Sequence, residues 1–312
     1  MTRVHAHTIL LAVLLVSVVA CSPSAPPAPE RSIDDLLIDA HKLDLAGKPD
    51  EAAAIYRQAL ARQADSYDAH YGLGRVLDLS GRYEDARAHF TRAVDLAPAS
   101  HTEQAMRMLA ISWTFVRDLD HATGLFRDVY DRRLAANNLA AAAESANELA
   151  RVYLELGDID SAQQWYRTGH DVALRDKDLV PVLADLAEIR WEHAEARIAA
   201  RRGDATAASR HAAAVKRLID KGGNADQQVQ YTYLLGYMRF YLADYGGARE
   251  QLRQADQTDP FILLLLAQAS EKLQEPAEAR AYYEHVLAST SHAINAAFAR
   301  PIARARLEAG VR

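Results

Sequence analysis

The chain is predicted to fold as an all-α array of repeated helical hairpins, on the basis of its composition, its length and an internal apolar period. Half of its 312 residues are hydrophobic but only 7% are aromatic, and alanine is used far more than valine or isoleucine. Such a composition favours helices over sheets. A chain of this length is close to the upper limit for one compact core, so two domains or an elongated array are expected.

Charge and cysteine content exclude several classes of protein. The formal net charge is -6, and the chain has one cysteine. Broad binding to nucleic acid or to an anionic membrane surface needs a basic face, so no nucleic-acid partner is expected. A single cysteine excludes an intramolecular disulfide and every Cys-based zinc finger.

Residues 1–20 have the pattern of a secretory signal peptide. A short polar start containing Arg3 precedes an apolar run over residues 9–19, which is too short to cross a bilayer. The segment ends in Val-Val-Ala immediately before Cys21, the single cysteine. This arrangement resembles the lipobox of bacterial lipoproteins, in which a signal peptidase cuts before the cysteine.

The lipobox resemblance implies an anchor and an address in the cell envelope. It implies that Cys21 carries a diacylglyceryl thioether and an acylated amino terminus, and two or three acyl chains hold a membrane stably. Residues 21–32 are rich in proline and serine and are expected to form an extended tether. In Gram-negative lipoproteins, Ser22 after the cysteine implies transport to the outer membrane, facing the periplasm. The alternative is a chance cysteine beside an ordinary cleavage site.

Residues 67–100 contain the clearest copy of an internal repeat. Its fixed positions are occupied by Leu73, Gly74, Leu77, Gly81, Tyr83, Ala86, Phe90, Ala93 and Pro98. This spacing resembles the tetratricopeptide repeat (TPR), a pair of antiparallel helices with a period of about 34 residues. Small residues at Gly74, Ala86 and Ala93 let the two helix axes approach closely. Gly81 is expected to end the first helix and Pro98 to stop the second.

The same pattern recurs along the chain, and each copy has an alanine where its second helix meets the first. These alanines are Ala52, Ala86, Ala122, Ala162, Ala208, Ala248 and Ala279. The unit at residues 189–222 is degenerate, and longer helices or loops are expected around it. We therefore expect a right-handed α-solenoid of about seven TPR-like hairpins over residues 33–293, followed by a capping helix over residues 294–312. Pro301 is expected to kink or begin that helix.

A concave groove is the candidate functional site, because the first helices of stacked hairpins line one face of the array. The candidate partner-binding residues on that face are Tyr71, Arg75, Arg107, Asn147, Arg151, Arg197, Tyr233 and Tyr237, and Arg190 belongs to the same basic track. Arginine and tyrosine often dominate binding energy in interfaces, and an arginine fork suits a peptide carboxylate. The paired Lys and Asn of chaperone-binding TPR proteins are not reproduced.

Structural ion pairing is the alternative role of these arginines. Their expected partners in neighbouring repeats are Asp68, Asp78, Glu144 and Glu155. The sequence alone leaves both interpretations open.

Catalytic and metal-binding patterns are weak. No GxSxG, HExxH, P-loop or CxxC sequence is present. The most metal-like cluster is formed by His193, Glu188, Glu192 and Glu195 on one expected helix. A solvated charged face is the favoured interpretation of that cluster. We expect no enzyme activity, no cofactor and no bound metal.

Three hypotheses of different classes follow. The leading one is a lipid-anchored scaffold of the bacterial cell envelope that binds a peptide or protein in its groove. The second is a pilotin or other structural part of an outer-membrane machine, which would use the convex face or the termini. The third is a metal-dependent enzyme that uses His193 and its neighbouring glutamates. Homo-oligomer formation is left open.

Overall fold

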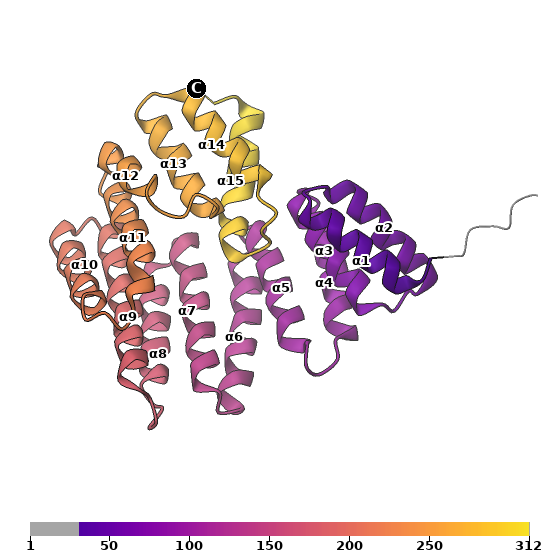
Figure 1. The fold of residues 1–312 in the computed structure, drawn as a ribbon, viewed down its shortest axis with the longest axis horizontal. Helices are drawn as coiled ribbons and strands as arrows, with labels where there is room; N and C mark the ends of the chain where they lie inside the picture. The colour runs from indigo at the N-terminus through magenta and orange to yellow at the C-terminus, as the bar shows by residue number, and fades with distance from the viewer. Residues whose placement is uncertain (1–30, 312) are drawn as a thin grey trace, which may run out of the picture. The chain divides into compact units, whose positions relative to one another are not determined.

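Helical hairpins follow one another along residues 31–311, the part of the chain that the computed structural model describes (Figure 1). Residues from Ile33 onward form one unit of the fold. The predicted signal peptide, Cys21 and most of the predicted tether lie outside the described residues. Fifteen α-helices, one 3-10 turn and no strand occur in the described part. The predicted all-α fold is therefore confirmed.

Seven consecutive helix pairs and one final helix make up this unit. The pairs are α1 (Ile33–Leu45) with α2 (Pro49–Arg62), α3 (Tyr67–Leu79) with α4 (Tyr83–Leu96), α5 (Thr102–Phe115) with α6 (Leu119–Ala135), α7 (Leu139–Leu156) with α8 (Ile159–Ala173), α9 (Pro181–Arg201) with α10 (Ala205–Ile219), α11 (Gln228–Tyr241) with α12 (Tyr245–Leu252), and α13 (Pro260–Lys272) with α14 (Pro276–Ala288). The 3-10 turn η1 (Ala225–Gln227) precedes α11, and α15 (Ile294–Ala309) comes last. Each helix contacts the next one in the chain.

A recurring tight turn joins the two helices of a pair. One residue adopts a left-handed backbone conformation, and the residue after it is the N-cap of the second helix. The left-handed residue is Gly81 (φ 85°) in the clearest copy, as predicted, whereas the sixth pair places Ala243 (φ 63°) there. In several pairs the N-cap is an aspartate, as at Asp244, whose carboxylate accepts the backbone N–H of Gly247. This chemistry fixes the short antiparallel connection.

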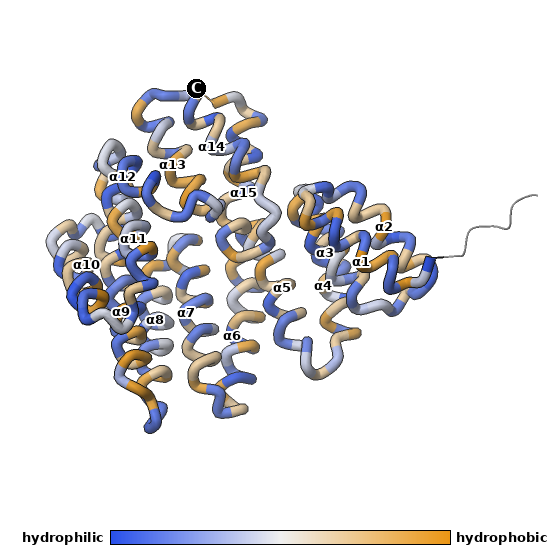
Figure 2. The backbone as a smooth tube through the Cα atoms, viewed as in Figure 1, coloured by the Kyte–Doolittle hydropathy of each residue, from blue (hydrophilic) through white to orange (hydrophobic). Residues whose placement is uncertain are grey.

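Close packing inside each pair depends on the alanine that the sequence places there. All seven of these alanines are fully buried: Ala52, Ala86, Ala122, Ala162, Ala208, Ala248 and Ala279. A large side chain of the same helix then fills the space beside the alanine, as Phe90 and Tyr283 do. Hydrophobic and hydrophilic residues alternate along most helices, as Figure 2 shows. The degenerate fifth unit forms the same hairpin, because Ala208 keeps the contact that the fold requires.

The last helix returns to the third hairpin. α15 contacts α13 and α14, which precede it, and also α5, which lies far earlier in the chain. Pro301 lies inside α15 rather than at its start. The sequence predicted a cap for the last apolar face but gave no sign of the contact with α5.

A buried polar cluster joins the segment before α15 to α3 and α5. The Nε2 atom of His292 lies 2.8 Å from Oδ2 of Asp78, and the Ser112 hydroxyl donates to Oδ1 of Asp78 at 3.0 Å. Phe90 and Phe115 enclose the imidazole, each with its ring centre 5.5 Å away. Burial raises the pKa of Asp78 from its ordinary value, while His292 and Ser112 act in the opposite direction. Asp78 therefore serves this contact and is not a partner of a groove arginine.

Arg300 of α15 joins three segments through backbone carbonyl groups. Its guanidinium donates to the carbonyl oxygens of Val286, Leu287 and Ser289 at the end of α14, at 3.2, 3.0 and 2.7 Å. It also donates to the carbonyl oxygen of Leu79 at the end of α3, at 2.6 Å. A cation at helix C-termini satisfies carbonyl groups that have no partner within their own helix. Arg300 therefore connects the C-terminal helix to the end of α3, in the second hairpin of the array.

Replacing Arg300 with methionine is expected to lower the free energy of unfolding by about 2–4 kcal/mol, because four carbonyl oxygens lose a charged donor. Denaturant unfolding followed by circular dichroism measures the change. Arg306→Met is the matched control on the same helix. Arg306 is 56% exposed and lies 3.8 Å from Glu271, so its removal should cost at most about 1 kcal/mol. Equal losses in the two variants would contradict the proposed role of Arg300.

Candidate binding groove

First helices of successive pairs line a continuous polar groove. One cavity of about 520 Å³ lies between α7, α9, the start of α11 and the start of α15. A second cavity of about 570 Å³ lies beside it, between α5, α6 and α7. Glu144 and Glu148 of α7 line both cavities. The groove therefore runs from α5 past α7 to α9 and α11, and the start of α15 covers part of it.

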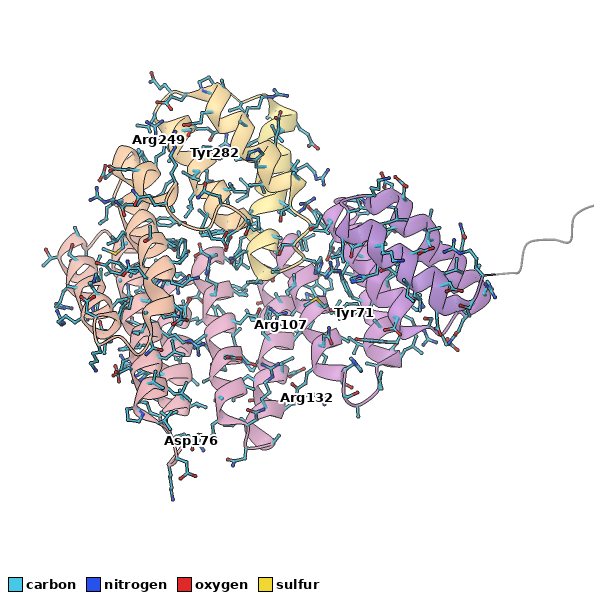
Figure 3. The ribbon with its side chains drawn as sticks, in the orientation of Figure 1. Tyr71, Arg107, Arg132, Asp176, Arg249 and Tyr282 are labelled. Atoms are coloured by element: carbon cyan, nitrogen blue, oxygen red, sulfur yellow. The ribbon has the colours of Figure 1, made fainter. Side chains whose placement is uncertain are left out.

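Arg75 and Arg107, two of the predicted groove residues, are held in ion pairs between neighbouring hairpins. Arg75 of α3 bonds Asp44 of α1, with Nη2 and Oδ2 3.1 Å apart. Arg107 of α5 (labelled in Figure 3) bonds Glu148 of α7, with Nε and Oε2 2.7 Å apart. The sequence predicted pairing between neighbouring repeats but not these two carboxylates. Neutralised in this way, both arginines contribute little net charge to the groove.

Asn147, Arg151, Arg190 and Arg197 together line the cavity between α7 and α9, as the sequence predicted for one face of the first helices. Arg190 is 45% exposed and lies 3.8 Å from Glu144, which is a loose pair. Arg151 and Arg197 are set much deeper. These four residues come from two consecutive first helices, α7 and α9.

The three predicted tyrosines differ in their exposure. Tyr71 is partly buried, and its hydroxyl accepts a hydrogen bond from the amide of Gln104 at 3.0 Å. Tyr233 is 5% exposed, and Tyr237 is fully buried. The expectation that Tyr237 contacts a partner is therefore wrong for this conformation. α9 and α13 cover the Tyr237 ring. The ring lies against Phe261, and its hydroxyl accepts a hydrogen bond from Arg201.

Arg151 connects four helices and is mainly structural. Its guanidinium lies over the rings of Phe261, Phe298 and Tyr233, at 4.9, 5.8 and 5.9 Å from the ring centres. It also donates to the Tyr233 hydroxyl at 3.3 Å. A desolvated cation over an aromatic face contributes up to about 2 kcal/mol. α7 is thereby tied to α11, α13 and α15 in one place.

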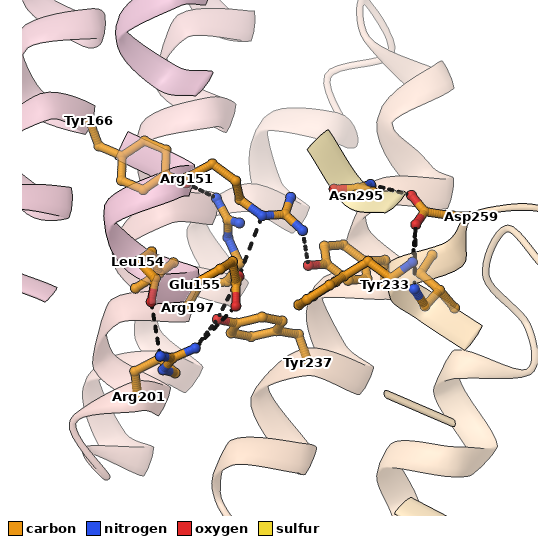
Figure 4. A network of polar contacts seen from close by, with 12 residues as sticks. Arg151, Leu154, Glu155, Tyr166, Arg197, Arg201, Tyr233, Tyr237, Asp259 and Asn295 are labelled. Atoms are coloured by element: carbon orange, nitrogen blue, oxygen red, sulfur yellow. Dashed lines mark hydrogen bonds and ion pairs between the residues drawn. The ribbon is translucent and has the colours of Figure 1, made fainter. Parts of the chain in front are cut away.

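Glu155 is the carboxylate at the centre of this polar network (Figure 4). Its side chain is only 3% exposed, and it lies 3.4 Å from Arg151 and 3.1 Å from Arg201. The Tyr237 hydroxyl donates to it at 3.1 Å. Arg201 in turn donates to the carbonyl oxygen of Leu154 at 2.9 Å. The sequence offered Glu155 as a partner of a groove arginine in a neighbouring repeat; Arg151 instead meets it within α7, and the partner from the next repeat is Arg201.

Arg197 differs from its neighbours because it has no carboxylate partner in the described part of the chain. It is 5% exposed, and its Nη2 donates to the Tyr166 hydroxyl at 2.8 Å. Its Nε and Nη1 atoms are buried and make no hydrogen bond. Its guanidinium also lies 5.3 Å from the centre of the Tyr166 ring. Two donors of a buried cation are thus unsatisfied in a residue that lines the cavity between α7 and α9.

His193 lies beside these arginines and not in a metal cluster. Its Nε2 donates to the Gln230 carbonyl oxygen at 3.3 Å, and its ring stacks on Tyr233 at 6.0 Å. Burial lowers the pKa of His193 well below its ordinary value, and the charge of Arg197 adds to this effect. A neutral imidazole therefore faces the cavity at neutral pH.

The three glutamates near His193 in sequence are engaged with residues of other helices. Glu188 bonds His170, Glu192 bonds His211, and Glu195 accepts the amide of Gln163. Within residues 31–311, no group of three or more His, Cys, Asp or Glu side chains is arranged to hold a metal ion.

Residues that sequence reasoning missed are Arg201, Asn295 and the C-terminal helix itself. Arg201 lies one helical turn after Arg197 on α9, so the helical spacing could have predicted that it lies on the same face and near Glu155. Asn295 lines the cavity between α7 and α9 and donates to Asp259 at 2.6 Å. Nothing in the repeat pattern places Asn295 there, because the position depends on the return of α15.

The fold and the groove define the class of protein, which is an array of stacked helical hairpins with a concave polar face. Profiles described as "Tetratricopeptide repeat" match residues 45–101, and residues 143–169 and 262–291. The chain therefore contains tetratricopeptide repeats. Repeats of this kind form interaction scaffolds that are typically non-catalytic, and no catalytic family is indicated. No curated protein matches the sequence.

Solved structures resemble this chain at low sequence identity. The apo form of RapI has a TM-score of 0.53 at 11% identity, over 89% of this chain and 99% of that chain. A putative kinesin light chain from Podosopora anserina with nearly identical TPR-like repeats has a TM-score of 0.50 at 16% identity, over 62% of this chain and 97% of that one. Cut9 with Hcn1, an APC/C hetero-tetramer, has a TM-score of 0.43 at 15% identity, over 87% of this chain. This chain spans about half, 49%, of the length of that chain.

Glu155→Gln is expected to lower the free energy of unfolding by about 3 kcal/mol, because Arg151 and Arg201 lose their shared buried counter-charge. Thermal and denaturant unfolding of the purified protein measure this loss. The matched control is Glu84→Gln on the exposed side of α4, which should change stability by less than about 0.5 kcal/mol. A Glu155→Gln variant as stable as wild type would show that the network does not depend on this charge.

Proposed function

We propose that this protein is an envelope-anchored interaction scaffold that binds an extended segment of a partner protein in the groove between α5, α7, α9 and α11. The observation that carries the proposal is the placement of Asn147, Arg190 and Arg197 on consecutive first helices around one cavity of about 520 Å³. Its volume lies within the range of ligand pockets, about 300–1,000 Å³. Tetratricopeptide repeats in the chain make a protein or peptide the expected class of partner.

The groove can receive a peptide from its exposed side. Arg190 is 45% exposed at the rim, and Glu144 beside it is 61% exposed. Gln104 and Arg107 extend the same polar lining along the second cavity. Exposed polar side chains above a buried basic floor allow a chain to enter and then to be held by specific hydrogen bonds.

The membrane part of the proposal rests on the sequence around Cys21 and on the tether that follows it. Among the described helices, none has the length and apolarity needed to cross a bilayer. A lipid on Cys21 would hold the repeats near the membrane through residues 22–32.

Affinity capture tests the groove. The double variant Asn147→Ala/Arg190→Ala is expected to lose a protein that wild type recovers from detergent-solubilised envelopes, identified by mass spectrometry. It leaves the structural arginines at 75, 107 and 151 in place, so unfolding temperature and circular dichroism should match wild type. Arg132→Ala is the matched control, because Arg132 is exposed on α6 and does not line the groove (Figure 3). The same proteins recovered with all three forms would reject the groove and favour an assembly role for the convex face.

Cys21→Ser tests the anchor. The variant is expected to leave the membrane fraction and to lose incorporation of labelled palmitate, since serine forms no thioether. Ser22→Ala, which keeps the cysteine, serves as the control and should still be labelled. An unlabelled wild-type protein that fractionates like the serine variant would reject lipidation.

A further inference from the structure

We infer that the connector between α8 and α9, together with the first turn of α9, is a surface through which two copies of this chain pair about a two-fold axis. Residues 174–183 form this connector surface. None of them lines either cavity of the groove, so the inference goes beyond the proposed function. It is carried by the apolar side chains and the charge pattern of these residues.

Exposed apolar side chains concentrate on the connector surface. Among the described residues, eight large hydrophobic side chains are exposed, and four of the eight are Leu174, Val180, Val182 and Leu183. Their exposed fractions are 40, 49, 39 and 49%. A small cavity of about 170 Å³ lies beside them, with Leu179 and Leu183 in its wall. Single exposed hydrophobic residues are ordinary, whereas a group of them marks an interaction surface.

Hydrogen bonds hold the backbone of the connector surface in place before a partner arrives. Oδ1 of Asp176 accepts the backbone N–H of Asp178 at 3.0 Å, and the Val180 carbonyl oxygen accepts the N–H of Leu183 at 2.9 Å. The buried amide of Asn224 donates to the carbonyl oxygen of residue 182 at 3.0 Å. A surface that is already ordered loses less conformational entropy on association.

The charges of the connector are complementary to themselves. Arg175, Asp176, Lys177 and Asp178 alternate in sign, and all four are exposed. Within the described part of the chain, none of the four makes an ion pair. Figure 3 labels Asp176 at the outer end of this connector.

A two-fold axis between Asp176 and Lys177 would satisfy all of these charges. Two antiparallel copies of the connector place Arg175 of each copy against Asp178 of the other, and Asp176 against Lys177. In such an interface the same surface serves both copies, so each contact occurs twice. Opposite charges in register select the partner and fix its orientation.

A second copy fits this surface better than a membrane or a strongly charged partner. The four connector charges sum to zero, and the flanking Asp171 and Asp185 already contact His170 and Lys221, at 3.3 and 2.6 Å. An anionic lipid surface attracts a cluster of basic residues, which the connector does not contain. A partner with one dominant sign of charge gains nothing from an alternating series.

Analytical ultracentrifugation of the full chain, in detergent matched in density to the solvent, tests the pairing. Ten residues per copy form a small interface, so wild type is expected to shift reversibly from the mass of one chain towards that of two as its concentration rises. Arg175→Asp/Lys177→Asp and Asp176→Lys/Asp178→Lys should each stay monomeric, because like charges then face each other. Mixed together, these two variants should associate again.

The mixture separates directed pairing from a general effect of charge. All four side chains are exposed and unpaired within the described residues, so both variants should unfold at the wild-type temperature. A wild-type chain that stays monomeric would overturn the inference. Variants that associate separately as wild type does, or that fail to associate when mixed, would also overturn it.

Val180→Ser/Leu183→Ser tests the apolar part of the surface. The double variant is expected to weaken self-association at least tenfold, because two side chains that the dimer would bury lose their hydrophobic contribution. Ile38→Ser/Leu45→Ser on α1 is the matched control, since these residues are 53% and 60% exposed and lie outside the connector surface. Equal weakening in both double variants, or in neither, would overturn the inference.

Lipid binding is the competing outcome. The Cys21→Ser chain, which cannot form the thioether anchor, should not float with vesicles of phosphatidylcholine and phosphatidylglycerol. Flotation that disappears when Val180→Ser/Leu183→Ser is added would assign the connector surface to a membrane and overturn the pairing of two copies.

Discussion

The return of α15 to α3 and α5 is the constraint on which the groove depends. Stacked hairpins alone leave the concave face open, and the cavity beside α7 and α9 takes part of its wall from Ile294 and Asn295 at the start of α15. Arg300 and the His292–Asp78 contact hold that helix in place through partners more than 200 residues away in sequence. Gly81, which turns the chain between α3 and α4, lies beside the guanidinium of Arg304 of α15.

Local residue patterns predicted the hairpins because the information is local. Seven buried alanines and the turn at Gly81 lie within single repeats, where helical spacing decides which side chains face each other. Phe261 and Leu264 illustrate what such patterns could not supply. Repeat register places both residues on the concave face, yet they are 4% and 2% exposed because α15 covers α13. No spacing rule within one repeat describes a contact between the last helix and the third hairpin.

The groove arginines show why residue type alone does not assign a role. Arg75 and Arg107 lie in inter-repeat ion pairs, Arg151 lies among aromatic rings, and Arg197 retains unsatisfied donors. All were predicted on one face, and that placement holds for those at the cavity between α7 and α9. Their different environments arise from carboxylates and rings contributed by other helices, which a single-helix pattern does not contain. Structural contacts therefore account for Arg75, Arg107 and Arg151, whereas the proposed partner binding falls to Arg190 and Arg197.

Arg197 is the groove arginine whose role stability alone does not explain. Isolated in the core, Arg197 would be replaced by a well-packed apolar residue without loss, since buried ion pairs and buried charges rarely add net stability. The helix around it is otherwise consistent, with Ala194, Ile198 and Ala200 buried as the repeat requires. Departures from local consistency concentrate at functional sites. Because Glu155 is already shared by Arg151 and Arg201, Arg197 has no carboxylate partner among the described residues, and its side chain lines the cavity in which we propose that the partner binds.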